Sequence, residues 1–110
     1  MAFSAGDVVL VPFPYRDRLA ERTRPAVIVS GQTYNQNADL VIAAITSQPS
    51  RFDTDHELLD WDAAGLKVSS TVRMLLATVA ETRVQLHIGR LTDRDWSEVK
   101  IRIGRVFTYP

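Results

Sequence analysis

The sequence predicts a mainly β protein of the α+β class, a small sheet with one helix at its C-terminal end. Short apolar runs rich in β-branched residues recur along the chain, separated by turns that contain Gly, Pro, Asn or Asp. Near the C-terminus, apolar side chains recur instead at helical spacing. A chain of 110 residues with 45% hydrophobic and 24% charged residues is typical of one globular domain, so a single domain is expected over residues 1–110.

Three strands are predicted in the first part of the chain. An apolar run over residues 8–13 ends at Pro14 and predicts the first of them. Residues 25–29 predict the second, with Pro25 at its start, where a missing N–H costs no interior ladder bond. Residues 40–45 are almost continuously apolar, which indicates a central strand buried on both faces. The polar residues 16–23 are expected to form an exposed loop.

The rest of the sheet is predicted from shorter signals. Within the acidic segment 48–62, residues 57–59 are the one expected strand fragment, and residues 60–65 predict a helical turn with Asp60 as cap and Gly65 as stop. Residues 69–81 are long enough for a strand with a bend or for two strands. Residues 84–88 alternate between apolar and polar, which favours another short strand.

The C-terminal helix has the clearest pattern in the chain. Thr92 followed by Asp95 predicts a capping box, with Asp in the place of the usual Glu. A stripe of apolar side chains then follows at helical spacing, and it predicts the face of the helix that packs on the sheet. The stripe consists of Trp96, Val99, Ile103, Val106 and Phe107.

Charge and composition exclude several classes of protein. The 13 basic and 13 acidic residues cancel, which argues against a protein that coats nucleic acid through a uniform positive field. Most of the basic residues are Arg, whose planar fork suits phosphate. The absence of Cys excludes disulfides, a catalytic thiol and thiolate metal sites. No secretion signal or membrane-spanning run is visible, so a cytoplasmic protein is expected.

A first candidate site combines Arg24, at the start of one predicted strand, with Thr46 and Ser47, at the end of the next. If these strands are antiparallel neighbours, the start of one lies beside the end of the other. A guanidinium and two hydroxyls would then converge on a site of the size of a phosphate. The alternative is structural, because Arg before Pro also forms salt bridges at sheet ends and Thr-Ser is common in turns.

Three further polar features of the sequence could carry chemistry. Arg73 interrupts an apolar strand, so its charge must face solvent, a groove or a partner. The group Asp53, Asp55 and His56 resembles a metal cluster, but it lacks the glycine turn and terminal Glu of a calcium loop. A solvated acidic loop without metal is therefore expected there. His87 is expected to fill a half-exposed strand position.

Several short blocks occur in a fixed order along the chain. They are Gly6-Asp7-Val8-Val9, Val11-Pro12-Phe13, Arg24-Pro25-Ala26-Val27-Ile28-Val29-Ser30, Tyr34-Asn35, Ile45-Thr46-Ser47, Gly65-Leu66, Ser69-Ser70 with Val72-Arg73, and Ile88-Gly89 with Leu91. Together they resemble the MazF/PemK family of toxins from type II toxin–antitoxin pairs. No single block is decisive, and the resemblance comes from their order, spacing and coverage.

The resemblance implies a small SH3-like or CcdB-like barrel that forms a homodimer. It also implies a metal-independent endoribonuclease, an mRNA interferase without cofactor that cuts single-stranded RNA by 2′-hydroxyl attack and is inhibited by an acidic MazE-like antitoxin. Family members place an Arg and a Thr at the positions that match Arg24 and Thr46, which we therefore expect to be catalytic. Substrate contacts are expected from Arg16, Glu21, Ser47, Gln48 and Arg73.

The resemblance leaves the general base open. Some relatives have an acidic residue two positions after the Arg that matches Arg73, and here that position is Leu75. The substitutes are Asp17, Glu21, His56 and Arg24 itself, although a guanidinium is a poor base at neutral pH.

Two other functions remain as alternatives. A non-catalytic CcdB-like toxin that inhibits gyrase has the same fold, and the missing carboxylate at Leu75 would suit it. A metal hydrolase built on Asp53, Asp55 and His56 would lose its activity in EDTA.

Overall fold

The computed structural model describes residues 3–15 and 21–108. In this part of the chain, a six-stranded antiparallel sheet has the strand order β4-β5-β3-β2-β1-β6. The strands are β1 (Asp7–Phe13), β2 (Arg22–Ile28), β3 (Asp39–Thr46), β4 (His56–Glu57), β5 (Thr71–Ala80) and β6 (Leu86–Arg90). The helical elements are α1 (Gln32–Asn35), the 3-10 turn η1 (Glu81–Arg83) and α2 (Asp93–Val106).

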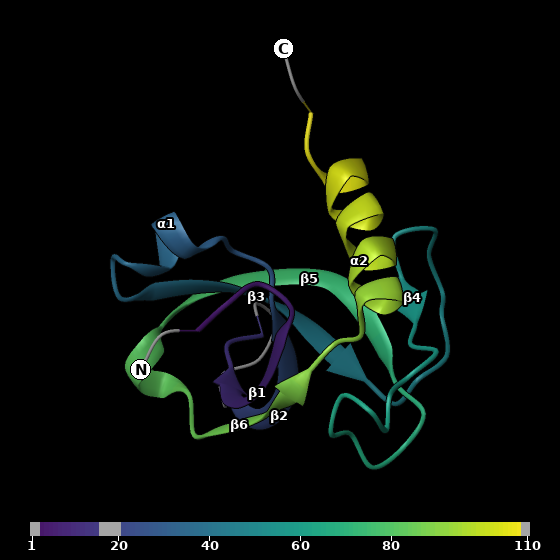
Figure 1. Cartoon of the computed structure of the whole chain (residues 1–110), viewed down its shortest axis with the longest axis horizontal. Helices are drawn as coiled ribbons and strands as arrows, with labels where there is room; N and C mark the ends of the chain where they lie inside the picture. Colours follow the sequence, from purple (N-terminus) through teal and green to yellow (C-terminus); the bar gives the residue numbers. More distant parts are fainter. Residues whose placement is uncertain (1–2, 16–20, 109–110) are drawn as a thin grey trace.

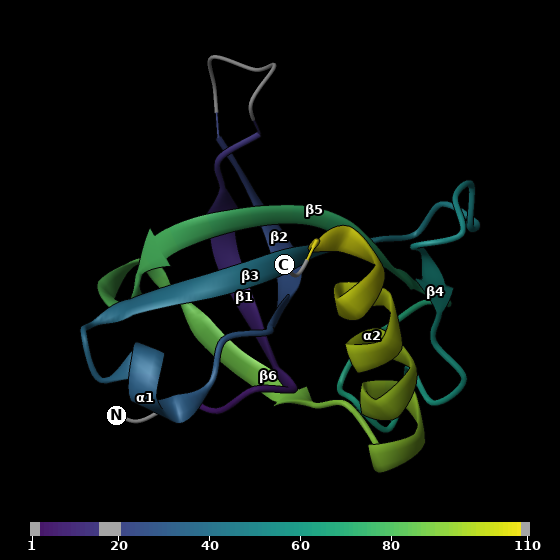
Figure 2. The same cartoon turned by 90° about the horizontal axis from the view of Figure 1, so that it is seen from above.

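The sheet is strongly curled. In Figure 2, β3 and β5 run side by side across the view, and β1 and β2 cross them at a steep angle. Figure 1 shows the sheet bent around its own interior, with α2 at one end and pointing away from it. The predicted class is confirmed, since the sheet is a half-open barrel with a C-terminal helix.

Two apolar clusters fill the two faces of the sheet. Val9 and Val11 of β1 belong to one cluster, and Val8 belongs to the other. Ile42 and Ala43 divide β3 in the same way, and both are fully buried. Because β3 lies between β5 and β2 and is buried on both faces, the prediction for residues 40–45 is confirmed.

A bulge bends β5 beside the centre of the sheet. Ala43 of β3 pairs with Leu76, whereas its neighbour Ala44 pairs with Arg73. Met74 and Leu75 are therefore extra residues on β5, and such an insertion bends a strand and redirects its side chains. The first of the two predictions for residues 69–81, one strand with a bend, is the correct one.

The segment that links β4 and β5 packs against β6. Ala64 N donates to Asp60 O at 3.2 Å, so the predicted turn forms, and it ends at Gly65 with a φ of +90°. A Cβ added to Gly89 of β6 would lie 2.3 Å from Ala64 O. The two backbones can come this close only because position 89 has no side chain.

The start of α2 is held by a group of polar side chains that we call the helix anchor, made of His56, Asp60, Thr92, Arg94 and Asp95. Asp95 is fully buried, and its carboxylate accepts hydrogen bonds from His56 Nε2 at 2.8 Å and from the backbone N–H groups of residues 59 and 60. Arg94 donates twice to Asp60, at 2.7 and 2.6 Å. Hydrogen bonds from Arg94 and then Thr92 hold the pKa of the Asp60 carboxyl well below its usual range.

Two predictions about caps are therefore wrong. Thr92 is the N-cap residue, but its hydroxyl donates to Asp60 at 2.7 Å and makes no cap bond, so no capping box forms. The Asp60 carboxylate accepts hydrogen bonds from Thr92 and Arg94 and does not cap the turn that Asp60 begins. Both side chains instead join two segments that are distant in sequence.

Only the first part of the apolar stripe on α2 reaches the core. Val99 is fully buried, and Trp96 and Ile103 pack against the same cluster. Val106 and Phe107 are exposed by 39% and 50%, because the helix extends beyond the end of the sheet, as Figure 1 shows. The prediction of a core-facing helix is correct up to Ile103 and wrong beyond it. Within the described residues, no helix has the length and apolar character needed to cross a membrane.

Candidate functional site

A cleft of about 990 Å³ opens at one end of the barrel. Its walls come from the ends of β2 and β3, from β5 and β6, and from the segment 65–70. The polar side chains that line it are Tyr15, Arg24, Thr46, Ser47, Gln48, Lys67, Ser70, Arg73 and His87. Apolar residues such as Leu10 and Ile88 form the rest of the lining.

Pro25 explains why β2 and β3 separate at the cleft. Their pairing ends at Ala26 and Ala44. Leu10, the β1 partner of Pro25, turns its carbonyl toward Gln85, so the backbone of Pro25 faces β3. Proline has no N–H with which to continue the ladder on that side. The prediction that Pro25 begins the strand is wrong, because β2 begins at Arg22 and Pro25 ends only its pairing with β3.

The strand register brings the predicted catalytic pair together. Ala26, Ala44 and Arg73 lie side by side on β2, β3 and β5. The pairing of β2 with β3 stops at Ala26 and Ala44, and Arg24 and Thr46, each two residues beyond that pair, both line the cleft. Because residues two apart on a strand share a face, Arg24, Thr46 and Arg73 project from the same face of the sheet.

Arg24 and Thr46 have few partners in the protein. Arg24 Nη1 donates to Thr23 O at 3.4 Å, and within the described residues no carboxylate forms an ion pair with it. Thr46 Oγ1 accepts the N–H of Gln48 at 3.2 Å, which leaves its own proton to donate elsewhere. Both side chains are half-buried. A guanidinium and a hydroxyl in this state can donate hydrogen bonds to a phosphate.

Arg73 is held in place by the segment between β3 and β4. Its Nη2 donates to Asp55 Oδ2 at 3.3 Å and to Pro49 O at 3.5 Å. The Asp55 side chain is completely buried, whereas the Arg73 side chain keeps 21% exposure toward the cleft. Among the described residues, Arg73 Nε and Asp55 Oδ1 are buried without a hydrogen-bond partner. The ion pair with Asp55 therefore fixes the position of Arg73 and leaves part of the guanidinium's hydrogen-bond donors without a partner.

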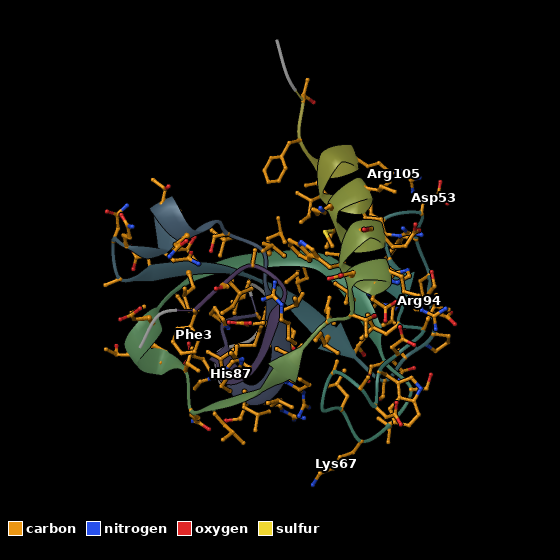
Figure 3. The ribbon with its side chains drawn as sticks, in the orientation of Figure 1. Phe3, Asp53, Lys67, His87, Arg94 and Arg105 are labelled. Atoms are coloured by element: carbon orange, nitrogen blue, oxygen red, sulfur yellow. The ribbon has the colours of Figure 1, made fainter. Side chains whose placement is uncertain are left out.

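The cleft has a positive charge. Arg24, Lys67 and Arg73 line it, and the described lining contains no Asp or Glu. Figure 3 shows Lys67 at the tip of its segment, extending away from the sheet. Leu75, in the position where some relatives have a carboxylate, also lines the cleft. Such a site attracts an anion and contains no carboxylate to repel it.

The other predicted substrate contacts are only partly brought together. Ser47 and Gln48 line the cleft and are exposed. Glu21 lies outside the cleft lining and forms a salt bridge with Arg83. Arg16 and the alternative base Asp17 lie outside the described residues. The exposed loop predicted over residues 16–23 is wrong at its end, because Arg22 and Thr23 belong to β2.

The segment Asp53, Asp55 and His56 differs from the solvated acidic loop that was predicted. Asp55 is buried and accepts hydrogen bonds from Arg73 and from backbone N–H groups. His56 is buried in the helix anchor and contacts Asp95. Only Asp53 is exposed. These side chains point to different partners, and within residues 3–15 and 21–108 no group of three or more His, Cys, Asp or Glu could hold a metal ion.

Sequence reasoning missed Lys67, Ser70 and His87 as cleft residues. Lys67 lies between the blocks Gly65-Leu66 and Ser69-Ser70, and its isolated positive charge there is the only signal that the sequence offers. His87 was expected at a half-exposed strand position, and its side chain is 41% exposed. Its Nε2 lies 3.0 Å from Gly89 O and 3.7 Å from Asp7 Oδ1. Figure 3 shows that it lies beside Phe3, away from α2.

Comparison with solved structures identifies the fold class as that of the MazF toxins. A mycobacterial endoribonuclease bound to its cognate antitoxin superposes with a TM-score of 0.78 at 18% identity, over 99% of this chain and 100% of that chain. MazF from Deinococcus radiodurans gives a TM-score of 0.75 at 20% identity, over 96% of each chain. The Mycobacterium tuberculosis toxin MazF-mt6 gives 0.74 at 17% identity, over 92% of this chain and 95% of that chain.

The family follows from the sequence itself. The model of the PemK-like, MazF-like toxins of type II toxin–antitoxin systems matches residues 4–107. The chain therefore belongs to this family, and the resemblance seen in the sequence blocks is confirmed. No curated protein matches the chain significantly in sequence.

Proposed function

We propose that this toxin is a metal-independent, sequence-specific endoribonuclease that cuts single-stranded RNA, with mRNA as its target. The observation that supports the proposal is that Arg24 and Thr46 line the same positively charged cleft. Membership of the MazF-like family and the fold shared with a mycobacterial endoribonuclease support it.

Cleavage starts with attack of the ribose 2′-hydroxyl oxygen on the adjacent phosphorus. O2′ gives up its proton as the new O2′–P bond forms, and O5′ takes up a proton as the P–O5′ bond breaks. One product therefore ends in a 2′,3′-cyclic phosphate and the other in a 5′-hydroxyl. Negative charge accumulates on the phosphoryl oxygens in the transition state. Arg24 and Thr46 donate hydrogen bonds to these oxygens, and one such donor is worth about 3–4 kcal/mol of barrier.

Arg73 binds a phosphate next to the scissile one, with Ser47 and Gln48 as further contacts. Its ion pair with Asp55 holds the guanidinium at the cleft before RNA arrives, so little ordering is needed on binding. The proton of the 2′-hydroxyl does not go to a carboxylate of the described cleft lining, because none of those residues is Asp or Glu.

The same cleft also suits the inhibitor. An acidic, flexible MazE-like antitoxin segment would occupy the RNA path and become ordered on binding. Several of the solved structures with this fold are MazE–MazF complexes from Deinococcus radiodurans. RNA and antitoxin then compete, and RNA affinity unchanged at saturating antitoxin would contradict this part of the proposal. We also propose that the toxin acts as a homodimer in the cytoplasm, and sedimentation of the purified protein tests the dimer.

The experiment uses purified protein and a mixed-sequence single-stranded RNA, with and without EDTA, followed by analysis of the product ends. Cleavage in EDTA with cyclic-phosphate and 5′-hydroxyl ends is expected. Thr46→Ala is expected to lower the rate about 10²-fold or more. Thr78→Ala is the matched control, because Thr78 is an exposed Thr of the same sheet outside the cleft lining.

No cleavage, together with binding to gyrase, would favour the CcdB-like alternative. Cleavage abolished by EDTA would favour the metal hydrolase.

A further inference from the structure

An exposed aromatic ring stands immediately outside the cleft. Phe52 lies in the segment between β3 and β4, and 58% of its surface is exposed. Arg73, which lines the cleft, has its guanidinium carbon 6.0 Å from the centre of this ring. The Phe52 ring therefore lies next to the cleft but outside its lining.

Hydrogen bonds hold the backbone that carries Phe52 in a fixed shape. The buried Asp55 carboxylate accepts the N–H of Arg51 at 2.8 Å and the N–H of Phe52 at 3.2 Å. Asp55 N closes the turn by donating to Phe52 O at 2.9 Å. Ser50 N donates to Glu57 Oε2 at 2.9 Å. An exposed apolar ring on a segment fixed in this way is preorganised for a ligand.

Helix α2 fixes the same segment from its other side. Arg102 Nε donates to Asp55 O at 2.8 Å, and Arg105 Nη1 donates to Asp53 O at 3.0 Å. Figure 3 shows Asp53 and Arg105 next to each other at this end of the molecule. A second hollow of about 500 Å³ lies here, lined by Ser50, Phe52, Asp53, Asp55, Arg102 and Arg105. There is thus space beside the ring.

Two planar cations accompany the ring. The guanidinium carbon of Arg51 lies 5.6 Å from its centre, in addition to that of Arg73. Aromatic rings and guanidinium planes are the groups on which unpaired nucleobases stack. The adjoining hollow is lined by carboxylates (Asp53, Asp55) and by guanidinium groups (Arg102, Arg105), so neither sign of charge prevails beside the uncharged face of the ring. An unpaired base, which is uncharged and planar, suits such a place.

We propose that Phe52, with Arg51 and Arg73, is a stacking platform for an unpaired base of the RNA, outside the step that is cut. The platform lengthens the RNA segment that the toxin contacts, and it rests on the proposed function only in taking RNA as the substrate. Arg73 then serves both places, because it binds a phosphate in the cleft and borders the stacked base.

Binding of an RNA analogue tests the platform without requiring cleavage. A single-stranded oligonucleotide with 2′-O-methyl groups lacks the attacking hydroxyl, and its affinity can be measured by fluorescence anisotropy. Phe52→Ala is expected to weaken binding about 5- to 100-fold. Phe52→Trp is expected to keep the affinity and to show quenching of the indole by the RNA. Leu59→Ala is the control, because Leu59 is a large apolar residue with 60% exposure that lies outside the described linings of both the cleft and the hollow.

Cleavage of two substrates then separates stacking from a structural effect. A dinucleotide supplies only the step that is cut, and the platform is proposed to hold a base outside that step. With a dinucleotide, Phe52→Ala is therefore expected to leave kcat/KM unchanged, whereas with a longer RNA it raises KM. Equal losses on both substrates, or no loss of affinity in Phe52→Ala, would overturn the proposal. Weakened antitoxin binding with unchanged RNA affinity would assign the ring to a protein partner instead. A wild-type protein that binds RNA through Phe52 but does not cut it would refute the proposed function and leave the platform standing.

Discussion

The cleft and the helix anchor use the same kinds of residue in opposite ways. In the anchor, the carboxylate of Asp95 is fully buried and accepts hydrogen bonds from His56 and from two backbone N–H groups. In the cleft, Arg24 contacts only one backbone carbonyl at 3.4 Å among the described residues. A charge whose hydrogen bonds are satisfied inside the protein stabilises the fold, whereas a charge left with spare donors beside a cleft is available to a ligand.

The largest effect on stability is expected in the anchor. Asp95→Asn removes the carboxylate from His56 and turns an amide N–H₂ toward one of two backbone donors. We expect the free energy of unfolding to fall by about 3–5 kcal/mol, as measured by urea denaturation. Asp93→Asn is the control, because Asp93 is an exposed acid in the same first turn of α2. A loss below about 1 kcal/mol would mean that the anchor does not hold the helix.

A smaller effect on the free energy of unfolding is expected where the segment 60–66 packs against β6. The Cβ of Gly89→Ala would lie 2.3 Å from Ala64 O, so one backbone must move. Overpacking of this kind costs about 1–3 kcal/mol. Gly104→Ala in α2 is the control, since nothing lies within 4 Å of its added Cβ, and it should stabilise the helix by about 1 kcal/mol. If both variants had the same stability, the close approach at Gly89 would not constrain the fold.

The smallest effect on stability is expected from the exposed ion pair of the helix anchor, Arg94 with Asp60. Arg94→Ala removes the main cause of the low pKa of Asp60, so an NMR titration should show that pKa moving up toward its ordinary value. A carboxyl with a lowered pKa in the folded state adds stability above its unfolded pKa and loses it as the pH falls through the folded one. The wild type should therefore exceed the variant in stability near neutral pH and lose that advantage in acid. An unchanged titration of Asp60 would contradict the assignment.

Much of the fold could be predicted from the sequence because the strands coincide with apolar runs. Residues 8–13 and 40–45 lie within β1 and β3, and the helical spacing after Thr92 located α2. The bend in β5 was predicted only as one of two possibilities. Its cause, the two extra residues opposite Ala43 and Ala44, depends on the partner strand and has no local signal.

That Arg24 and Thr46 line one cleft could be predicted, because it requires only that consecutive strands be neighbours. The roles of Asp55 and His56 could not. Their partners, Arg73 and Asp95, are 18 and 39 residues away in sequence, and no local pattern links them. The same reasoning misassigned Asp95 to a capping box, because a capping motif and a long-range anchor use the same residue types.

One measurement tests the difference between cleft and anchor most directly. It is the rate of RNA cleavage by Arg24→Ala, taken together with its free energy of unfolding. We expect the rate to fall about 10²–10³-fold with the stability within about 0.5 kcal/mol of the wild type. Arg83→Ala is the control, because Arg83 is an exposed arginine outside the cleft lining. Unchanged cleavage, or a loss of cleavage that merely follows a loss of stability, would contradict the assignment of Arg24 to the substrate.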